Sequence, residues 1–311
     1  MSALAAKKAA SNRPLAISLL LGVSGWVAGG FTLMLVELMF RPATSGHEAF
    51  SGLLLLGMAW GLFTTDRDGE RVFVAQLALA LSIAGQCLVL FAMTKNAHGI
   101  GPIASAALLL QVALALVMPN RLHRTLSTFF ALVAWALTVR FVLFGEPEDW
   151  YRSGSPYSAS LPAALAGWML AWGPVAIILG LVIRREAMWA GRSWAPALSS
   201  IVTGLIGGLA FATLASHPFE SFRWFGGGGA TVGYLALWPL LSALASLGAL
   251  AVAFELRRRG LMALCAVAAL LHVGHFYYAL GTSLLVKSLL MLMMGAAFLA
   301  VAHVLRSKEA A

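Results

Sequence analysis

The chain has 311 residues, of which 60% are hydrophobic and 11% charged, and its mean hydropathy is +0.87. This composition lies far outside the range of soluble domains and predicts a polytopic membrane protein. A net charge of +9 would suggest nucleic-acid binding in a soluble chain, but loops that flank membrane helices are also rich in Lys and Arg, so no nucleic-acid partner is expected.

Apolar stretches that could span a membrane follow one another along the whole chain. A spanning helix needs roughly 20 apolar residues. Because the connections between the stretches are short, the sequence predicts one all-α domain, residues 1–311, folded as a polytopic transmembrane helical bundle of about ten helices. The predicted spans are 15–40, 49–65, 72–94, 99–118, 124–145, 161–183, 196–215, 231–254, 260–281 and 283–304.

The distribution of Lys and Arg predicts the orientation of these helices. Most of the 21 Lys and Arg residues lie in the terminal segments or in loops on the same side of the membrane as the N-terminus. Loops on the opposite side carry only Arg41, Lys95, Arg152 and Arg223. Since cytoplasmic loops are enriched in Lys and Arg, we expect both termini in the cytoplasm and membrane lipids as partners.

Glycines and prolines inside the spans indicate how the helices pack and bend. The Gly-x-x-x-Gly motifs at 25–29 and 204–208 would allow close approach of neighbouring helices. Pro174 and Pro239, which follow tryptophans closely, predict helix kinks because each removes a backbone hydrogen bond. Interrupted helices line the binding sites of some transporters but also occur in bundles without a transport role, so both interpretations stay open.

Two loops on the predicted periplasmic side, 146–162 and 217–229, mix aromatic and charged residues. Such a mixture is typical of loops that lie against the lipid headgroups. The alternative is a mobile lid over a cavity that opens outward.

Ionisable residues inside the spans are candidate functional residues, because charges at membrane depth are costly and usually find a partner. We hypothesise that Glu37, Arg140, His275 and Lys287 form a polar cluster open to the periplasmic leaflet, although long side chains near an interface could also extend outward to water. The candidates are Glu37, Glu48, Arg140, His272, His275 and Lys287.

His272 and His275 lie three residues apart and therefore share one helix face. A zinc site would need a third and a fourth ligand. Glu37 and Glu48 could supply them only if their helices packed beside the ninth span. We therefore predict a hydrogen-bonded structural pair of histidines, no metal site and no catalytic residue.

The stretch from His275 to Ser288 reads HFYYALGTSLLVKS. It resembles the C-terminal signature of a bacterial membrane family catalogued as domain of unknown function 4401, and the close match covers the last 35 or so residues. The signature positions are Phe276, Tyr277, Tyr278, Lys287 and Ser288. The resemblance implies a polytopic inner-membrane protein with no established activity and, as a partner, a small membrane protein with a GDYxxLxY motif.

Three classes of function remain open at the level of the sequence. Chain length, helix number and predicted kinks favour a non-enzymatic carrier of a small or lipid-like substrate. The family resemblance favours a subunit of an envelope complex that contains the GDYxxLxY-type protein. An enzyme acting on a lipid-linked or periplasmic substrate would have only His272, His275 and Glu37 as catalytic candidates, and the absence of P-loop and Rossmann motifs predicts no cofactor.

Overall fold

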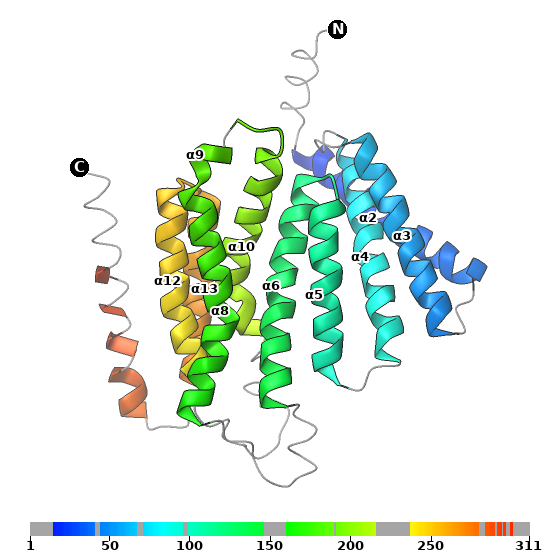
Figure 1. The fold of residues 1–311 in the computed structure, drawn as a ribbon. Helices are drawn as coiled ribbons and strands as arrows, with labels where there is room; N and C mark the ends of the chain where they lie inside the picture. The colour runs from blue at the N-terminus through cyan, green and yellow to red at the C-terminus, as the bar shows by residue number, and fades with distance from the viewer. Residues whose placement is uncertain are drawn as a thin grey trace. The chain divides into compact units, whose positions relative to one another are not determined.

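The computed structural model describes residues 15–40, 44–66, 71–95, 99–145, 160–189, 191–215, 237–279 and 284–289 and parts of 291–300 (Figure 1). The chain divides into two compact units, Met1–Ser127 and Thr128–Ala311, whose boundary falls inside one helix. The predicted loop at 217–229 lies outside the described residues, as do residues 146–159 of the other loop.

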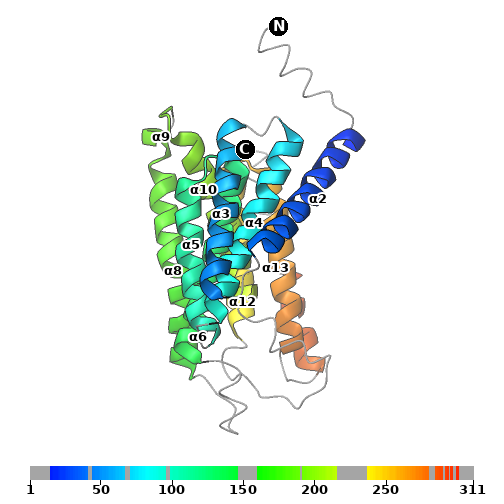
Figure 2. The same cartoon turned by 90° about the vertical axis from the view of Figure 1, so that its right-hand side faces the viewer.

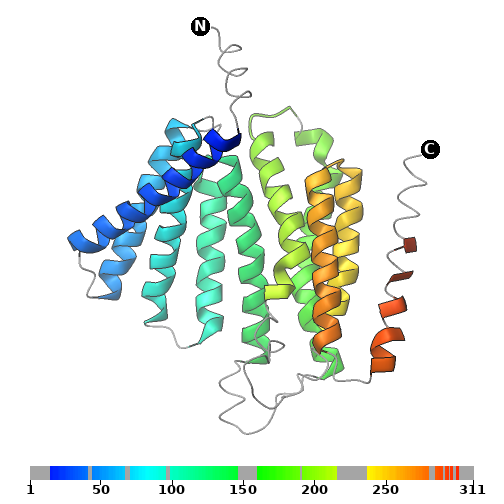
Figure 3. The same ribbon diagram turned by 180° about the vertical axis from the view of Figure 1, so that it is seen from behind.

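Unit 1 is built around one central helix. It contains α2 (Leu15–Phe40), α3 (Ser45–Thr65), α4 (Val72–Thr94), α5 (Ile100–Val117) and the first turns of α6 (Arg121–Phe144). The central helix α4 packs against α2, α3 and α5. Figures 2 and 3 show that α2 crosses α4 obliquely.

Close helix contacts in unit 1 depend on glycine. A Cβ atom on Gly25 would lie 2.9 Å from the carbonyl oxygen of Phe73, and one on Gly29 would lie 2.7 Å from the Cβ of Ala80. Both neighbours belong to α4. The close approach predicted for the motif at 25–29 is therefore confirmed, and α4 is the helix that it contacts.

The apolar core of unit 1 lies on both sides of α4. One cluster joins α3, α4 and the C-terminal end of α5, and the other joins α2, α3 and α4. Their buried members are Leu56, Phe63, Ala78, Leu79, Leu114 and Met118 in the first cluster, and Val36, Leu55, Ala59 and Leu81 in the second.

Unit 2 continues α6 from Thr128 and adds α8 (Leu161–Arg184), the short α9 (Glu186–Trp189), α10 (Ala195–Ala215), α12 (Leu237–Glu255) and α13 (Arg259–Ala279). Helices α12 and α13 lie side by side, and α10 contacts both of them (Figure 3). The motif at 204–208 again marks a close contact, since a Cβ on Gly208 would lie 2.7 Å from Cδ1 of Leu132 in α6.

The core of unit 2 contains a fully buried tryptophan, Trp238. Its indole Nε1 donates a hydrogen bond of 2.8 Å to the carbonyl oxygen of Ala164, and its ring meets Phe144 edge to face at 5.8 Å. A Cβ on Gly167 would lie 2.6 Å from the Phe144 ring. Helix α8 thus approaches these aromatic rings through a residue that has no side chain.

The prolines predicted to kink helices lie in two different settings. Pro174 lies inside α8. Pro239 is the third residue of α12 as described, Leu237–Glu255. The kinks themselves stay predictions.

Within the described residues, nine helices are long and apolar enough to cross a membrane. The all-α, multi-pass fold is therefore confirmed, and most predicted spans end within a few residues of the observed helices. The tenth predicted span, 283–304, is described only in part and is helical at 284–289.

Candidate functional site

A chain of hydrogen-bonded polar side chains runs through the apolar interior of unit 1, and we call it the polar chain. Gln111 Nε2 donates to Gln86 Oε1 at 2.6 Å, and Gln86 Nε2 donates to Ser82 Oγ at 3.0 Å. Ser82 Oγ lies 2.6 Å from His123 Nε2, and His123 Nδ1 lies 3.2 Å from Ser127 Oγ. The chain thereby joins α4, α5 and α6.

Helical spacing explains why these side chains meet. Ser82 and Gln86 are four residues apart on α4, and His123 and Ser127 are four residues apart on α6, so each pair occupies one helix face. Asn120 precedes α6 and accepts a hydrogen bond from the backbone N–H of His123 at 3.1 Å, as an N-cap residue does. The start of α6 is thus fixed where the imidazole can reach α4.

Further contacts hold His123 and its helix. The ring of Phe63 on α3 meets the imidazole edge to face, with the ring centres 5.4 Å apart. The guanidinium of Arg124 donates to the carbonyl oxygens of Ala115 and Met118, at 2.9 Å and 2.8 Å. These bonds use carbonyl groups at the end of α5 and tie that end to the first turn of α6.

Each member of the polar chain is hydrogen-bonded to the next. Ser82, His123, Ser127 and Gln111 are buried, and Gln86 is half-buried. When the Ser82 hydroxyl donates to His123 Nε2, all donors in the chain run in one direction, from Gln111 toward Ser127. Aligned hydrogen bonds of this kind polarise and strengthen one another.

One end of the polar chain is open. Gln111 is 6% exposed, and its Oε1 atom has no hydrogen-bond partner among the described residues. A buried carbonyl oxygen without a donor costs roughly 1–3 kcal/mol. The site can therefore accept a hydrogen bond from a ligand that carries an N–H or O–H group.

Ser82 and His123 also have the spacing of a serine nucleophile and its general base. Other features of the pair disfavour this chemistry. Both side chains are buried, and the second ring nitrogen of His123 faces the Ser127 hydroxyl rather than a carboxylate that would stabilise a protonated ring. The arrangement is suited to hydrogen bonding rather than to nucleophilic attack.

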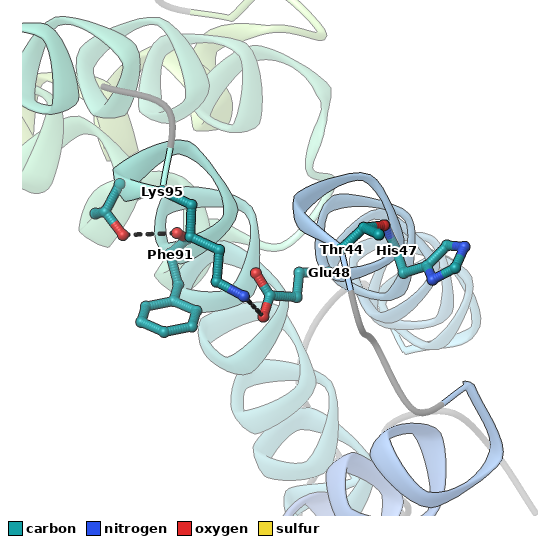
Figure 4. Close-up of polar contacts among 6 residues, drawn as sticks. Thr44, His47, Glu48, Phe91 and Lys95 are labelled. Carbon is teal, nitrogen blue, oxygen red and sulfur yellow. Dashed lines mark hydrogen bonds and ion pairs between the residues drawn. The ribbon is translucent and has the colours of Figure 1, made fainter. Parts of the chain in front are cut away.

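A second polar feature of unit 1 is an ion pair between α3 and the residue that follows α4. Lys95 Nζ lies 2.5 Å from Glu48 Oε1 (Figure 4). The carboxylate side chain is 8% exposed, whereas the lysine side chain is 41% exposed. The pair thus joins a buried anion to a cation that can reach water.

Arg140 and His272, both predicted as site residues, lie buried in unit 2. The guanidinium of Arg140 lies 5.7 Å and 5.6 Å from the ring centres of Phe141 and Phe144. His272 Nε2 lies 2.9 Å from the carbonyl oxygen of Ala210. The bond of His272 joins α13 to α10.

Two residues of the C-terminal signature, Tyr277 and Lys287, contact each other. The ammonium of Lys287 lies 5.0 Å from the centre of the Tyr277 ring, and Phe276 is buried. Ser288 donates to the carbonyl oxygen of Leu284 at 2.9 Å. The side chain of Tyr278 lies outside the described side chains.

The hypothesised cluster of Glu37, Arg140, His275 and Lys287 stays a prediction. Glu37 belongs to unit 1, where it is half-buried, and the other three residues belong to unit 2. Among the described residues, no group of three or more His, Cys, Asp or Glu side chains could hold a metal ion.

The sequence did not predict the polar chain. The predicted candidates were ionisable residues, whereas the members of the polar chain other than His123 are neutral, and His123 was not one of the candidates. A signal was present. All three glutamines of the protein, Gln76, Gln86 and Gln111, lie within the apolar spans 72–94 and 99–118. A neutral amide at membrane depth needs a partner as a charge does.

Apolar helices that could cross a membrane, with polar side chains paired between them, define a multi-pass helical membrane protein. The chain belongs to the family described as Domain of unknown function (DUF4401), whose model matches residues 14–308. The resemblance noted at the C-terminal signature thus extends over nearly the whole chain. No curated protein and no solved structure shows significant similarity to it.

Proposed function

We propose that this protein is a carrier in the inner membrane of a bacterium, with both termini in the cytoplasm, and that it moves a small polar solute without changing it chemically. The observation that supports the proposal is the open end of the polar chain at Gln111 Oε1. The orientation is supported by the distribution of Lys and Arg.

The polar chain is a costly way to fill the interior of a membrane protein. A leucine at position 111 would pack against neighbouring helices without burying a polar atom, whereas the glutamine leaves one carbonyl oxygen without a donor. Polar groups inside membrane helices mark substrate pathways when packing alone does not explain them.

The chemistry of the polar chain favours a solute that donates an N–H or O–H group to Gln111 Oε1. Its members offer amides, hydroxyls and an imidazole, which orient a ligand through hydrogen bonds. A ligand donor at Gln111 would complete the aligned chain that ends at Ser127.

Uptake into proteoliposomes tests the proposal. The full chain would be reconstituted and exposed to radiolabelled n-propylammonium, alanine, glycerol and lactate, which represent different charge classes. We expect at least one solute to enter faster than into liposomes without protein. The variant Gln111→Met should transport that solute at least tenfold more slowly. Methionine has a similar side-chain volume to glutamine but lacks the Oε1 acceptor.

Gln76→Met is the matched control. Gln76 lies on α4, whereas Gln111 lies on α5, and the Oε1 of Gln76 accepts a 2.9 Å hydrogen bond from Trp26 outside the polar chain. It should transport as the unaltered protein does. Equal uptake by protein-containing and empty liposomes, or full uptake by Gln111→Met, would contradict the proposal.

A further inference from the structure

The ion pair between Glu48 and Lys95 leaves buried oxygen atoms without partners. Glu48 uses Oε1 for Lys95, while its Oε2 atom has no hydrogen-bond partner within the described part of the chain. Ser51 is fully buried, and its Oγ is also without a partner there. Glu48 and Ser51 are three residues apart on α3 and so share one helix face.

The cation in this pair is held less firmly than the anion. Lys95 follows the last residue of α4, its side chain is 41% exposed, and its ammonium lies 5.3 Å from the centre of the Phe91 ring. An ammonium on a flexible four-carbon stem can turn toward water. Glu48 belongs to the first turn of α3, and its carboxylate points toward Lys95 (Figure 4).

We propose that Glu48 and Ser51 form a binding site for a small primary alkylammonium ion, which takes the place of the Lys95 ammonium at the carboxylate. The inference rests on the proposed carrier function and names its substrate class. A primary ammonium carries three N–H donors. These match the two carboxylate oxygens of Glu48 and the hydroxyl of Ser51, whereas Lys95 contacts only one of them.

The surroundings favour an organic ammonium over a metal ion. Calcium and magnesium bind six or more oxygen ligands. Glu48 and Ser51 offer only one carboxylate and one hydroxyl. The Phe91 ring beside the ammonium position supplies a cation–π contact and an apolar surface for a short alkyl chain.

Exchange of the two ammonium groups keeps the charge at the site constant. Lys95 enters water as the ligand enters the site, so the buried carboxylate is never left without a cation. The tethered lysine competes at a high effective concentration, which makes the ligand's apparent affinity weak. Removal of the lysine ammonium should therefore strengthen binding.

Thermal unfolding of the full chain in lipid nanodiscs, with n-propylammonium chloride as the probe, tests this site. Sodium chloride and tetramethylammonium chloride at equal concentration are the controls, since both supply a cation without N–H donors. We expect the melting temperature to rise with n-propylammonium and not with either control. Equal shifts with all three salts, or no shift with any, would overturn the proposal.

Variants assign the effect to the site. Lys95→Met should bind n-propylammonium at least tenfold more tightly, and Glu48→Gln should not respond to it. Ser51→Ala leaves the ion pair intact and should weaken binding at least threefold, so the test does not depend on the charge variants folding. A full response in Glu48→Gln would also overturn the proposal.

The transport and binding experiments separate the two proposals. If another solute is carried in a Gln111-dependent way while n-propylammonium does not bind, the ammonium site is wrong and the carrier function stands. If n-propylammonium binds through Glu48 but no solute of the panel is carried, the site stands and the carrier function is wrong.

Discussion

Gly52 on α3 and Gly85 on α4 face each other so closely that a Cβ atom on either would lie 2.7 Å from the carbonyl oxygen of the other. This contact brings the α3 backbone against the part of α4 that carries Ser82 and Gln86, and Ser51 precedes Gly52 directly. The candidate residues of unit 1 therefore lie beside a helix contact at which neither of the two facing residues has a side chain.

Gly85→Leu should separate α3 from α4 and lower the melting temperature. Insertion of a large side chain into a tight contact typically costs about 1–3 kcal/mol, and here the neighbours include backbone atoms that cannot turn away. Gly57→Ala on α3 is the control, because a Cβ there meets nothing within 4 Å. A Gly85→Leu protein as stable as the Gly57→Ala protein would show that the contact is not essential.

Ser82→Ala should destabilise the protein by about 1–3 kcal/mol, because the amide of Gln86 and the Nε2 atom of His123 would both lose their partner in a buried place. Ser105→Ala is the matched control, since the Ser105 hydroxyl bonds to a carbonyl oxygen of its own helix. The melting temperatures of the two variants in nanodiscs give the comparison. Similar losses in both would contradict a cooperative polar chain.

A double-mutant cycle measures the coupling within the polar chain. Gln86→Leu combined with Ser82→Ala should cost less than the sum of the single changes, because the first change already breaks the bond between them. Additive changes in the free energy of unfolding would show that the two residues act independently.

Lys95→Met should lower the melting temperature more than Glu48→Gln does. The first change leaves a buried carboxylate without its cation, and the second leaves a half-exposed lysine that can turn to water. Breaking a fully buried pair typically costs about 3–5 kcal/mol, and we expect less here because Lys95 is 41% exposed. The double variant should regain part of the stability lost in Lys95→Met, and failure to do so would contradict the pairing.

Lys287→Met tests the residue of the C-terminal signature that contacts Tyr277. Loss of the cation–π contact should cost about 0.5–1 kcal/mol, whereas Lys287→Arg should keep it because guanidinium also binds aromatic faces. The melting temperatures of both variants give the readout. If neither variant differs from the unaltered protein, the contact contributes nothing to stability.

The sequence predicted the helices well because the signal for a spanning helix is local. In lipid, a segment must satisfy its own backbone hydrogen bonds, so roughly 20 consecutive apolar residues indicate a span wherever they occur. The predicted span 72–94 agrees with α4, Val72–Thr94, for this reason. The same local information gave the close contact of the motif at 25–29, which faces α4.

Helix partners were harder to predict from motifs. Gly57 and Gly61 also form a Gly-x-x-x-Gly motif, yet a Cβ on either meets nothing within 4 Å. Gly52 and Gly85, neither of which has a glycine four residues away, form a close contact between α3 and α4. A spacing in one helix cannot show which face of it the neighbouring helix covers.

By itself, the sequence determined the class of the protein, its helices and its family, because these depend on composition and on order along one chain. Only the tertiary structure decided which polar side chains share a site. Gln111 reaches Gln86 across 25 positions and Lys95 reaches Glu48 across 47. Such pairs form only when the helix faces that carry them pack together. Within a membrane, small residues such as Gly52 and Gly85 allow close helix packing and so determine which faces meet.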